Sequence, residues 1–344
     1  MNILGLDIGG ANLKAAAADG QAASRSFEIW KAPERLTDEL QLLTADFPQP
    51  DIIAVTMTAE LADCFATKAE GVAHVIRAVV DWAGEIPVYV WRTAGGFAEA
   101  AAAIDEPQRV AAANWHALAT WVADQFEIEN GLLIDIGSTT TDLIPLAGRK
   151  SAAIGLTDPQ RLQSSELIYT GIRRTPLCAL AVSVPYRGGY CPLAAEWFAT
   201  TQDVYLTLGD IAPGEDHCET ADGRPATVDM SRARLGRMLC CDSEEFSDDD
   251  ARIAAQYIAD VQLQILATAV RRLSKRQEHP FETLVLSGSG SFLAQRLSRA
   301  SPELCNSQLI SLAAECTPAV ADAACAFAVA KLAEKRFSSS ETPN

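Results

Sequence analysis

Two segments of this chain repeat one pattern, in which an apolar strand reaches an aspartate and then turns at small residues. The first copy covers residues 4–10 around Asp7 and the second covers 133–139 around Asp135, so the two aspartates are 128 residues apart. Turns without bulky side chains let backbone N–H groups approach an anion closely. An aspartate at the mouth of such a turn can hold a divalent metal that bridges to the same anion. The repeat therefore predicts two facing turns that grip a metal-bound phosphate group.

A second strand with a polar tip follows each turn, over residues 12–15 and 140–143. We expect the turns and tips to supply the phosphate-binding groups, which are Gly9, Gly10, Asn12, Lys14, Gly137, Ser138, Thr139, Thr140 and Thr141. We expect the acids to supply the metal ligands, which are Asp7, Asp135 and Asp142. A lone Asp-Ile-Gly turn would equally suit a solvated acid, and three threonines would suit an ordinary strand. We base the prediction of a phosphate site on the fact that the pattern occurs twice.

The charge balance excludes a general nucleic-acid surface. The 344 residues carry a formal net charge of −17, which repels a polyanion. An acidic chain that binds an anion must gather its few cations at the site, which singles out Lys14, Lys68, Arg173 and Arg174. We find no apolar run of the length of a bilayer span and no basic segment before an apolar one at the N-terminus. We therefore expect a cytoplasmic protein without a membrane or nucleic-acid partner.

The nine cysteines are expected to be thiols in that compartment. None forms a C-x-x-C pair, and the four histidines are scattered along the chain. A zinc site stays open for one group, which is Cys191, Cys218, Cys240 and Cys241. The alternative is that these are small buried hydrophobic side chains.

Strand-like and helical segments alternate along the chain, which predicts an α/β fold. Strands are expected at residues 3–8, 12–18, 51–56, 88–91 and 283–286, and helices at 36–47, 67–84, 98–104, 114–126, 251–276 and 318–336. The alternation of strand-like and helical segments becomes less regular between about 156 and 250, where Pro, Gly and Asp are frequent. We expect a first domain at 1–128, a second at 129–344 that carries an insertion at about 156–250, and a frayed tail at 338–344.

Two familiar phosphate-binding motifs are missing or incomplete. The P-loop pattern, in which Gly-Lys and a hydroxyl residue follow an earlier glycine, does not occur. Gly288, Ser289 and Gly290 follow a strand, but Leu293 stands where the dinucleotide motif requires its third glycine. A P-loop is excluded, and a Rossmann site is weakly supported.

The acid-tipped hairpins and the late glycine-rich strand end together resemble the acetate kinase, sugar kinase, Hsp70 and actin superfamily. That resemblance implies two ribonuclease-H-like domains with a phosphorylated ligand in the cleft between them. It also implies that residues 7–14 and 135–142 are phosphate loops and that 287–291 is the loop that usually meets adenosine. The Gly-Ser-Gly sequence departs from a plain Gly-Gly in that loop, which counts against ATP more than against phosphate.

Denser motifs across nearly the whole chain are similar to the hydantoinase A/oxoprolinase-related group. They lie at residues 55–63, 67–72, 114–117, 137–142 and 174–176. Three further segments resemble the branch tied to methanofuran synthesis and tetrahydromethanopterin-linked one-carbon transfer, at 198–201, 207–211 and 220–223. This resemblance implies a transferase that condenses an aminomethylfuran bearing a diphosphate with the phenol of a glutamyl-tyramine or tyrosine-derived acceptor. Pyrophosphate would be released.

For such a reaction, Mg²⁺ held by Asp7 and Asp135 would act as a Lewis acid on the departing diphosphate, and Arg174 would bind the anion. A free phenol has a pKa of about 10, so the acceptor needs help to lose its proton. At a strand end, Glu60 and Asp63 are candidate bases, and Lys68 is a candidate cation that favours the phenolate. The sequence does not separate these roles, and all three residues would also suit an ordinary helix start.

Two other functions stay open at this stage. One is an ATP-dependent kinase or a hydrolase of the oxoprolinase kind, although such hydrolases resemble much larger assemblies. The other is a non-enzymatic nucleotide-gated clamp, for which we see no peptide-binding module. The predicted partners are small-molecule substrates, and a homo-oligomer stays open.

Overall fold

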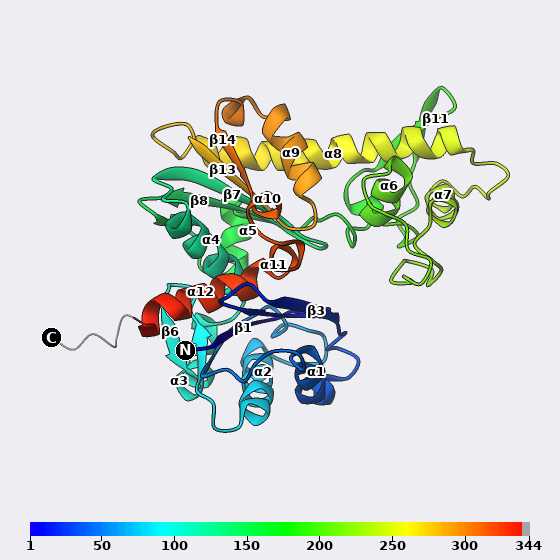
Figure 1. The fold of residues 1–344 in the computed structure, drawn as a ribbon. Coiled ribbons are helices and arrows are strands. Elements are labelled where there is room, and N and C mark those ends of the chain that lie inside the picture. Colours follow the sequence, from blue (N-terminus) through cyan, green and yellow to red (C-terminus); the bar gives the residue numbers. More distant parts are fainter. Residues whose placement is uncertain (339–344) are drawn as a thin grey trace.

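The protein contains two β-sheets, each with helices packed on both of its faces, in a computed structural model that describes residues 1–338 (Figure 1). The first sheet is built from β1 (Ile3–Ile8), β2 (Asn12–Ala17), β3 (Ala22–Ser26), β4 (Ile52–Met57), β5 (Val88–Trp91) and β6 (Phe97–Glu99). The second is built from β7 (Asn130–Ile136), β8 (Thr141–Ala147), β9 (Lys150–Ser151), β10 (Leu167–Ile168), β13 (Thr283–Ser287) and β14 (Gln308–Ser311). A separate hairpin joins β11 (Ser183–Tyr186) to β12 (Gly189–Pro192).

The helices fall between and around these strands. They are α1 (Leu36–Leu43), α2 (Lys68–Ala83), α3 (Ala100–Asp105), α4 (Asn114–Gln125), α5 (Asp158–Ser164), α6 (Thr201–Leu208), α7 (Val228–Arg237), α8 (Asp248–Ser274), α9 (Ser291–Ala300), α10 (Leu312–Glu315), α11 (Pro318–Asp322) and α12 (Ala324–Ser338). Short 3-10 turns lie at Pro33–Arg35, Pro107–Arg109, Leu177–Ala179 and Pro302–Leu304. The helix predicted at 318–336 is two helices, α11 and α12, because the chain breaks at Ala323. Residues 339–344 of the predicted tail lie outside the described residues.

The two sheets share one strand topology. The central strand β1 pairs antiparallel with β2 and parallel with β4, and β7 pairs antiparallel with β8 and parallel with β13. Strand orders β3-β2-β1-β4-β5 and β10-β8-β7-β13-β14 therefore correspond position by position. The sequence repeat is thus a repeat of whole sheets, which confirms the predicted pair of ribonuclease-H-like units.

Alternating layers of helices and sheets fill the molecule. Helices α1 and α2 cover the outer face of the first sheet, α8 and α9 cover the outer face of the second, and α4 and α12 lie between the sheets (Figure 1). Trp115 and Leu118 of α4 pack with Leu133 and Ile144 of the second sheet. The last helix, α12, packs against β1 and β4 of the first sheet. A domain boundary at 128/129 would group α4 with the first sheet and α12 with the second. In the structure α4 packs on the second sheet and α12 on the first, so the chain crosses between the halves twice.

Helix α12 approaches the first sheet closely because its buried face is made of alanine and its contact on β1 is a glycine. Ala326, Ala330 and Ala333 are fully buried. A Cβ atom on Gly5 would lie 2.0 Å from the backbone oxygen of Ala326. Small residues on both sides therefore set the distance between helix and sheet, and no side-chain movement can relieve added bulk.

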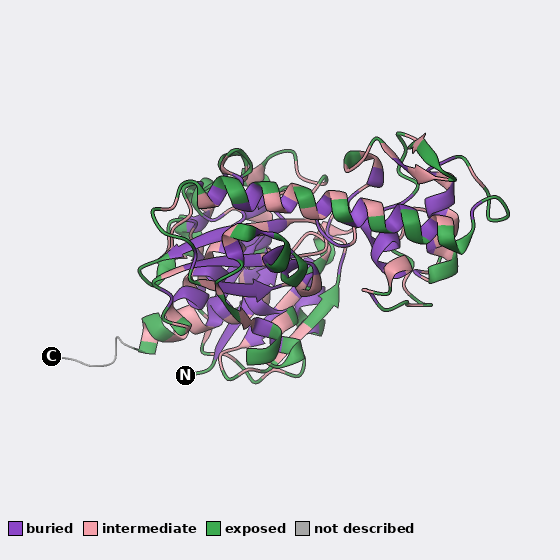
Figure 2. Ribbon diagram, turned by 90° about the horizontal axis from the view of Figure 1, so that it is seen from above, coloured by how far each residue is buried: buried purple, intermediate pink, exposed green. Residues whose placement is uncertain are grey.

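Residues 176–247, here called the inserted lobe, project from the second sheet together with the first turns of α8 (Figures 1 and 2). The lobe contains the β11–β12 hairpin, α6 and α7, which pack on α8. The segment predicted as an insertion at about 156–250 is therefore divided: α5 and β10 belong to the second sheet, since β10 pairs with β8. By length and composition α8 could cross a membrane, but it is packed as a core helix, with Leu266, Val270 and Leu273 fully buried.

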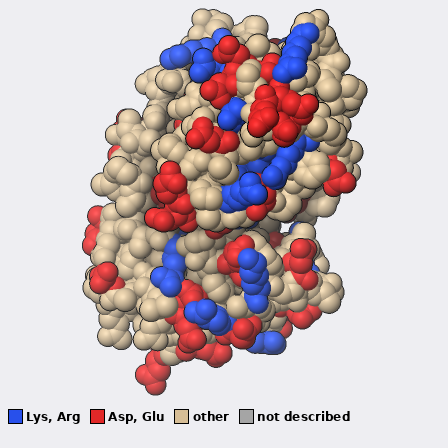
Figure 3. Space-filling model, turned by 90° about the vertical axis from the view of Figure 1, so that its right-hand side faces the viewer, with Lys and Arg blue, Asp and Glu red and all other residues tan. Residues whose placement is uncertain are grey.

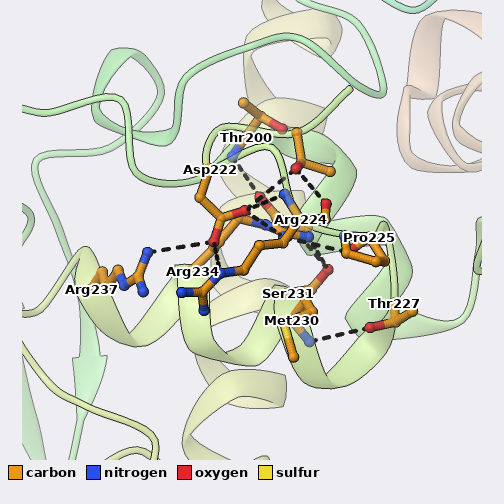
Figure 4. Close-up of polar contacts among 11 residues, drawn as sticks. Thr200, Asp222, Arg224, Pro225, Thr227, Met230, Ser231, Arg234 and Arg237 are labelled. Atoms are coloured by element: carbon orange, nitrogen blue, oxygen red, sulfur yellow. Dashed lines mark hydrogen bonds and ion pairs between the residues drawn. The ribbon is translucent and has the colours of Figure 1, made fainter. Parts of the chain in front are cut away.

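A buried ion-pair network holds the lobe together (Figure 4). The Arg234 side chain is completely buried and donates to Asp203 of α6 at 2.7 Å and to Asp222 of a long loop at 3.0 Å. Asp203 also accepts hydrogen bonds from Ser231 and from the backbone of Thr200. Burial raises the pKa of Asp203 and the Arg234 charge opposes that rise. Arg234 thereby joins the start of α6 to the loop around Asp222.

We predict that Gly5→Ala destabilises the protein by about 1–3 kcal/mol or more, because the added methyl group overlaps the backbone of α12. Urea denaturation measures the free energy of unfolding. Gly189→Ala is the matched control, since a Cβ at Gly189 meets nothing within 4 Å. Equal stability of the two variants would show that α12 is not held at this distance.

We predict that Arg234→Met lowers the free energy of unfolding by about 3–5 kcal/mol, because it leaves the buried Asp203 carboxylate without its cation. Arg237→Met is the control: Arg237 is 42% exposed and contacts Asp222 at 3.4 Å, so its loss should cost at most about 1 kcal/mol. Similar losses in both variants would contradict the assigned role of Arg234.

Candidate active site

The two predicted phosphate turns have the same backbone geometry. Gly9 N–H donates to the Asn12 carbonyl at 3.0 Å, and Gly137 N–H donates to the Thr140 carbonyl at 2.9 Å. These two amides are used by the turns themselves and are not available to a ligand. Within residues 1–338, no hydrogen bond to a protein acceptor is donated by the amides between them, which belong to Gly10, Ala11, Ser138 and Thr139. Each turn therefore presents free backbone donors, as anion-binding turns do.

Both aspartates of the repeat line one cavity of about 620 Å³ between the two halves of the molecule. Asp7 and Asp135 end the central strands of their sheets, and β2 and β8 place Lys14 and Asp142 directly opposite them. All four side chains line the cavity, together with Asn12, Gly137, Ser138 and Thr140. The parallel arrangement of strand ends brings the polar tips to the same edge in each sheet. The structure thus brings together the core of the predicted site.

The two carboxyl groups are strongly perturbed by burial. Desolvation raises the pKa of Asp7 to about 6, and Lys14 opposes the rise. Desolvation and the Asp142 charge raise the pKa of Asp135 to about 7, while a hydrogen bond from Ser287 and the Lys14 charge lower it. The Lys14 charge lowers the pKa of both Asp7 and Asp135, whereas the Asp7 charge raises the pKa of Asp135. The cavity therefore concentrates negative charge that a bound cation would stabilise.

These residues fit Mg²⁺ bound together with a phosphate group. The Asp7 Oδ1 atom is buried without a hydrogen-bond partner in the described chain. Among residues 1–338, no three His, Cys, Asp or Glu side chains form a group that could hold a metal alone. Mg²⁺ commonly takes one or two carboxylates and completes its shell with waters and substrate phosphates. Two buried carboxylates beside two anion-binding turns match that mode.

The glycine-rich strand end lies directly beside Asp135. Gly288 has φ +82, and a Cβ atom there would lie 2.5 Å from the Asp135 carboxylate and 2.3 Å from the Ile136 carbonyl. Only glycine fits that approach. Gly288 and Ser289 line the cavity, whereas Gly290 packs against Ile136. The loop that the resemblance assigns to adenosine contact thus lies beside the second phosphate turn.

Two predicted cavity residues are already paired with protein groups. The Lys14 ammonium group donates to the backbone carbonyl of Asp322 and lies 3.2 Å from its carboxylate. Asp142 is bound by Arg161, whose side chain is buried and stacks on Trp115. The Arg161 charge opposes the burial-driven rise in the pKa of Asp142. A metal at Asp142 would compete with this ion pair, which leaves Asp7 and Asp135 as the better ligands.

Arg173 is the cation that the predicted site residues left out. Its side chain is half-buried and lines the cavity. Among the described residues its guanidinium group makes no hydrogen bond or ion pair, and burial lowers its pKa. Its backbone N–H is held by the Ser138 carbonyl at 3.0 Å. The sequence had marked Arg173 only as one of several cations, because residues in an irregular segment have no period that shows which side chain faces a ligand.

Five predicted phosphate ligands do not line this cavity, and they are Gly9, Gly10, Thr139, Thr141 and Arg174. The Thr141 side chain is fully buried and donates to the Thr170 carbonyl at 2.8 Å. Thr139 is half-buried outside the cavity lining. Arg174 lines a neighbouring cavity instead and donates to Glu219 at 3.2 Å. Strand alternation explains Thr141, since Thr140 and Asp142 on either side of it do line the cavity.

The three candidates for acceptor activation lie elsewhere. The Glu60 side chain is 1% exposed, and burial raises its pKa to about 7. Lys68 lies 3.8 Å from Asp158 of α5, an ion pair that connects the two halves. Asp63 is exposed on the turn before α2. None of the three lines the cavity of Asp7 and Asp135, so the structure does not bring these candidates to the phosphate turns.

The cysteine group predicted as a zinc alternative is not assembled. All nine cysteines are free thiols in the described chain. Cys241 contacts the Tyr186 hydroxyl at 3.6 Å, and no metal-binding cluster includes it or the other three within residues 1–338.

Comparisons with known proteins identify the family of this chain. The family model described as hydantoinase/oxoprolinase matches residues 51–336. A protein of Methanocaldococcus jannaschii is 36% identical over 338 residues, 97% of this chain and 98% of that protein. It is named (4-{4-[2-(gamma-L-glutamylamino)ethyl]phenoxymethyl}furan-2-yl)methanamine synthase. A protein of Methanococcus vannielii with the same name is 34% identical over 163 residues, 47% of this chain and 72% of that protein.

A solved structure supports the fold alone. The nucleotide-free form of an acetone carboxylase, an enzyme of ATP-dependent acetone carboxylation, has a TM-score of 0.55 with 11% sequence identity. The match covers 96% of this chain and 70% of that one. Together with the family match over most of the chain, these findings show that the protein belongs to the hydantoinase/oxoprolinase family.

Proposed function

We propose that this protein is a transferase of methanofuran or methylofuran biosynthesis, which joins an aminomethylfuran diphosphate to a phenolic acceptor and releases pyrophosphate. The observation that supports this proposal is the cavity that Asp7, Asp135 and the unpaired Arg173 line beside two turns with free amides. The acceptor is a glutamyl-tyramine or a tyrosine-derived phenol. The name of the relatives supports this choice, because it describes a phenoxymethyl ether on a furan.

The ether bond defines the chemistry that the site must perform. The bond between the furan-bearing CH₂ group and the diphosphate oxygen breaks, and its electron pair stays on the diphosphate. A lone pair of the phenol oxygen forms the new C–O bond, and the departing diphosphate takes up the phenolic proton. Negative charge grows on the leaving group, so preorganised donors around that group contribute most of the acceleration.

The residues of the cavity divide this task. Arg173 and the free amide of Ser138 bind the diphosphate oxygens and stabilise the growing charge. Asp7 and Asp135 would hold Mg²⁺, which would supply Lewis-acid neutralisation of the leaving group. Lys14, held by Asp322, keeps the two carboxylates ionised enough to bind a cation. Glu60, Asp63 and Lys68 have no part in this scheme because they lie away from the cavity.

An ATP-dependent kinase or hydrolase is the second candidate, and one observation favours it. Gly288 and Ser289, which the resemblance assigns to adenosine contact, line the same cavity. Product identity separates the two candidates, since the transferase needs no ATP and releases pyrophosphate.

The free-thiol state of the nine cysteines supports action in the cytoplasm, where thiols stay reduced.

We predict that Asp7→Asn, Asp135→Asn and Arg173→Met each lower kcat by about 100- to 1,000-fold, because each removes charge stabilisation from the departing diphosphate. The assay couples ether formation to pyrophosphate release in the presence of Mg²⁺ and without ATP. Asp81→Asn, an exposed change on α2, should retain full turnover. Release of single phosphate, or an absolute requirement for ATP, would rule out the transferase.

We predict that Asp135→Asn stabilises the ligand-free protein at pH 8 and leaves stability unchanged near pH 4. The folded-state pKa of about 7 exceeds the ordinary 3.8, so folding favours the protonated acid and stability falls as the pH rises from about 4 through 7. The full difference is on the order of 4 kcal/mol. Urea denaturation across this pH range measures it, with Asp81→Asn as the control. A difference between variant and wild type that does not change with pH would show that the Asp135 carboxyl titrates normally.

A further inference from the structure

A second cavity of about 430 Å³ adjoins the first and opens on the inserted lobe. It shares Asn12, Ser138 and Arg173 with the first cavity, so the two meet at the phosphate turns. Its remaining walls come from Ser26 at the end of β3, from Arg174 just before the lobe, and from lobe residues that include Gln202, His217 and Glu219. The furan diphosphate of the proposed reaction occupies only the first cavity, which leaves the second without a role.

Two side chains present unused polar atoms in this second cavity. Gln202 is only 3% exposed, and its Nε2 atom is buried without a hydrogen-bond partner in the described chain. The Nε2 atom of His217 is likewise buried and unpartnered within residues 1–338. Leaving a buried polar group unsatisfied costs about 1–3 kcal/mol. A ligand with matching polar groups would satisfy both atoms.

The charged groups of the second cavity are complementary to an amino acid. Arg174 and Glu219 pair at 3.2 Å, and both are partly exposed to the cavity. Ser26 of the first sheet donates to the other Glu219 oxygen at 3.0 Å. An arginine beside a glutamate offers one group for a carboxylate and one for an ammonium group. On the face that presents the lobe, Lys and Arg side chains gather near the middle, among scattered acidic ones (Figure 3).

The walls of the second cavity are held in place by the phosphate turn and by the lobe network. The Ser138 carbonyl accepts hydrogen bonds from the backbone of Arg173 and Arg174, both at 3.0 Å. Gln202 N–H in turn donates to the Arg173 carbonyl at 3.3 Å. Behind these walls, Arg234 binds Asp203 of α6 and Asp222 (Figure 4), and Asp222 belongs to the same loop as His217 and Glu219. A preformed site of this kind loses little entropy when a ligand binds.

We infer that the second cavity binds the α-amino acid end of the phenolic acceptor and directs its phenol toward the phosphate turns. This inference rests on the proposed function and names the part of the substrate that the lobe recognises. The acceptor carboxylate receives hydrogen bonds from Gln202 Nε2 and Arg174, and its ammonium group pairs with Glu219. The shared wall of Asn12, Ser138 and Arg173 is where the phenol meets the furan CH₂ group.

The test compares γ-glutamyl-tyramine with tyramine, which lacks the glutamyl group. For wild type we expect a KM at least tenfold lower for γ-glutamyl-tyramine. In Glu219→Gln and Gln202→Leu we expect that preference to fall by at least tenfold, with little change in kcat or in the KM of the diphosphate substrate. Glu215→Gln, an exposed change on the same loop, is the control and should keep the wild-type preference.

Calorimetric binding of γ-glutamyl-tyramine alone, without the diphosphate, separates this inference from the proposed function. Weakened binding in both variants supports the second cavity as the acceptor site even if no ether forms. Ether formation by wild type, together with unchanged preference and binding in Glu219→Gln, would overturn the inference while leaving the transferase intact. Glu219 is partly exposed, so this variant tests the site even if Gln202→Leu folds poorly.

Discussion

The structure is organised around two carboxylates that are buried within reach of each other's charge. Asp7 and Asp135 end the central strands of two sheets with the same strand order, and both line one cavity. Burial raises the pKa of both groups toward neutrality, and the Lys14 charge offsets only part of that rise. A divalent cation bound with a phosphorylated ligand would relieve this cost. The two turns and Arg173 surround these carboxyl groups, and Gly288 approaches Asp135 closely.

The distance between the two turns depends on helices that lie far from them in sequence. The alanine face of α12 lies against Gly5 on the central strand of the first sheet, and α4 packs between both sheets. The break between α11 and α12 also lines the cavity, where Asp322 holds Lys14. Helices α11 and α12 therefore connect the first half of the molecule to the second. Small residues make this possible because backbone can approach backbone only where side chains are absent.

The inserted lobe extends this shared cavity into a second one. Its buried Arg234 holds α6 and the loop of His217 and Glu219 as one unit. Ser138 connects that unit to the second phosphate turn through the backbone of Arg173 and Arg174. The lobe thereby adds a second cavity beside the one that Asp7 and Asp135 line. The two cavities are connected because the Ser138 carbonyl holds the backbone of Arg173, which lines both cavities, and of Arg174, which lines the second.

The repeat around Asp7 and Asp135 predicted the sheets and the core of the site because strand, acid and turn are local in sequence. It did not separate Thr141, whose side chain is buried, from Thr140 and Asp142 on either side of it, which line the cavity because successive side chains alternate. The sequence could not place Glu60, Asp63 and Lys68, because closeness to a strand end does not tell which side of the next helix faces a ligand. It selected Arg174 for the anion, whereas the structure places Arg173 in the cavity of the two aspartates. Tertiary structure alone decided which cations are neutralised by acids and which stay free, since ion pairs such as Arg174 with Glu219 and Asp142 with Arg161 join residues that only folding brings together.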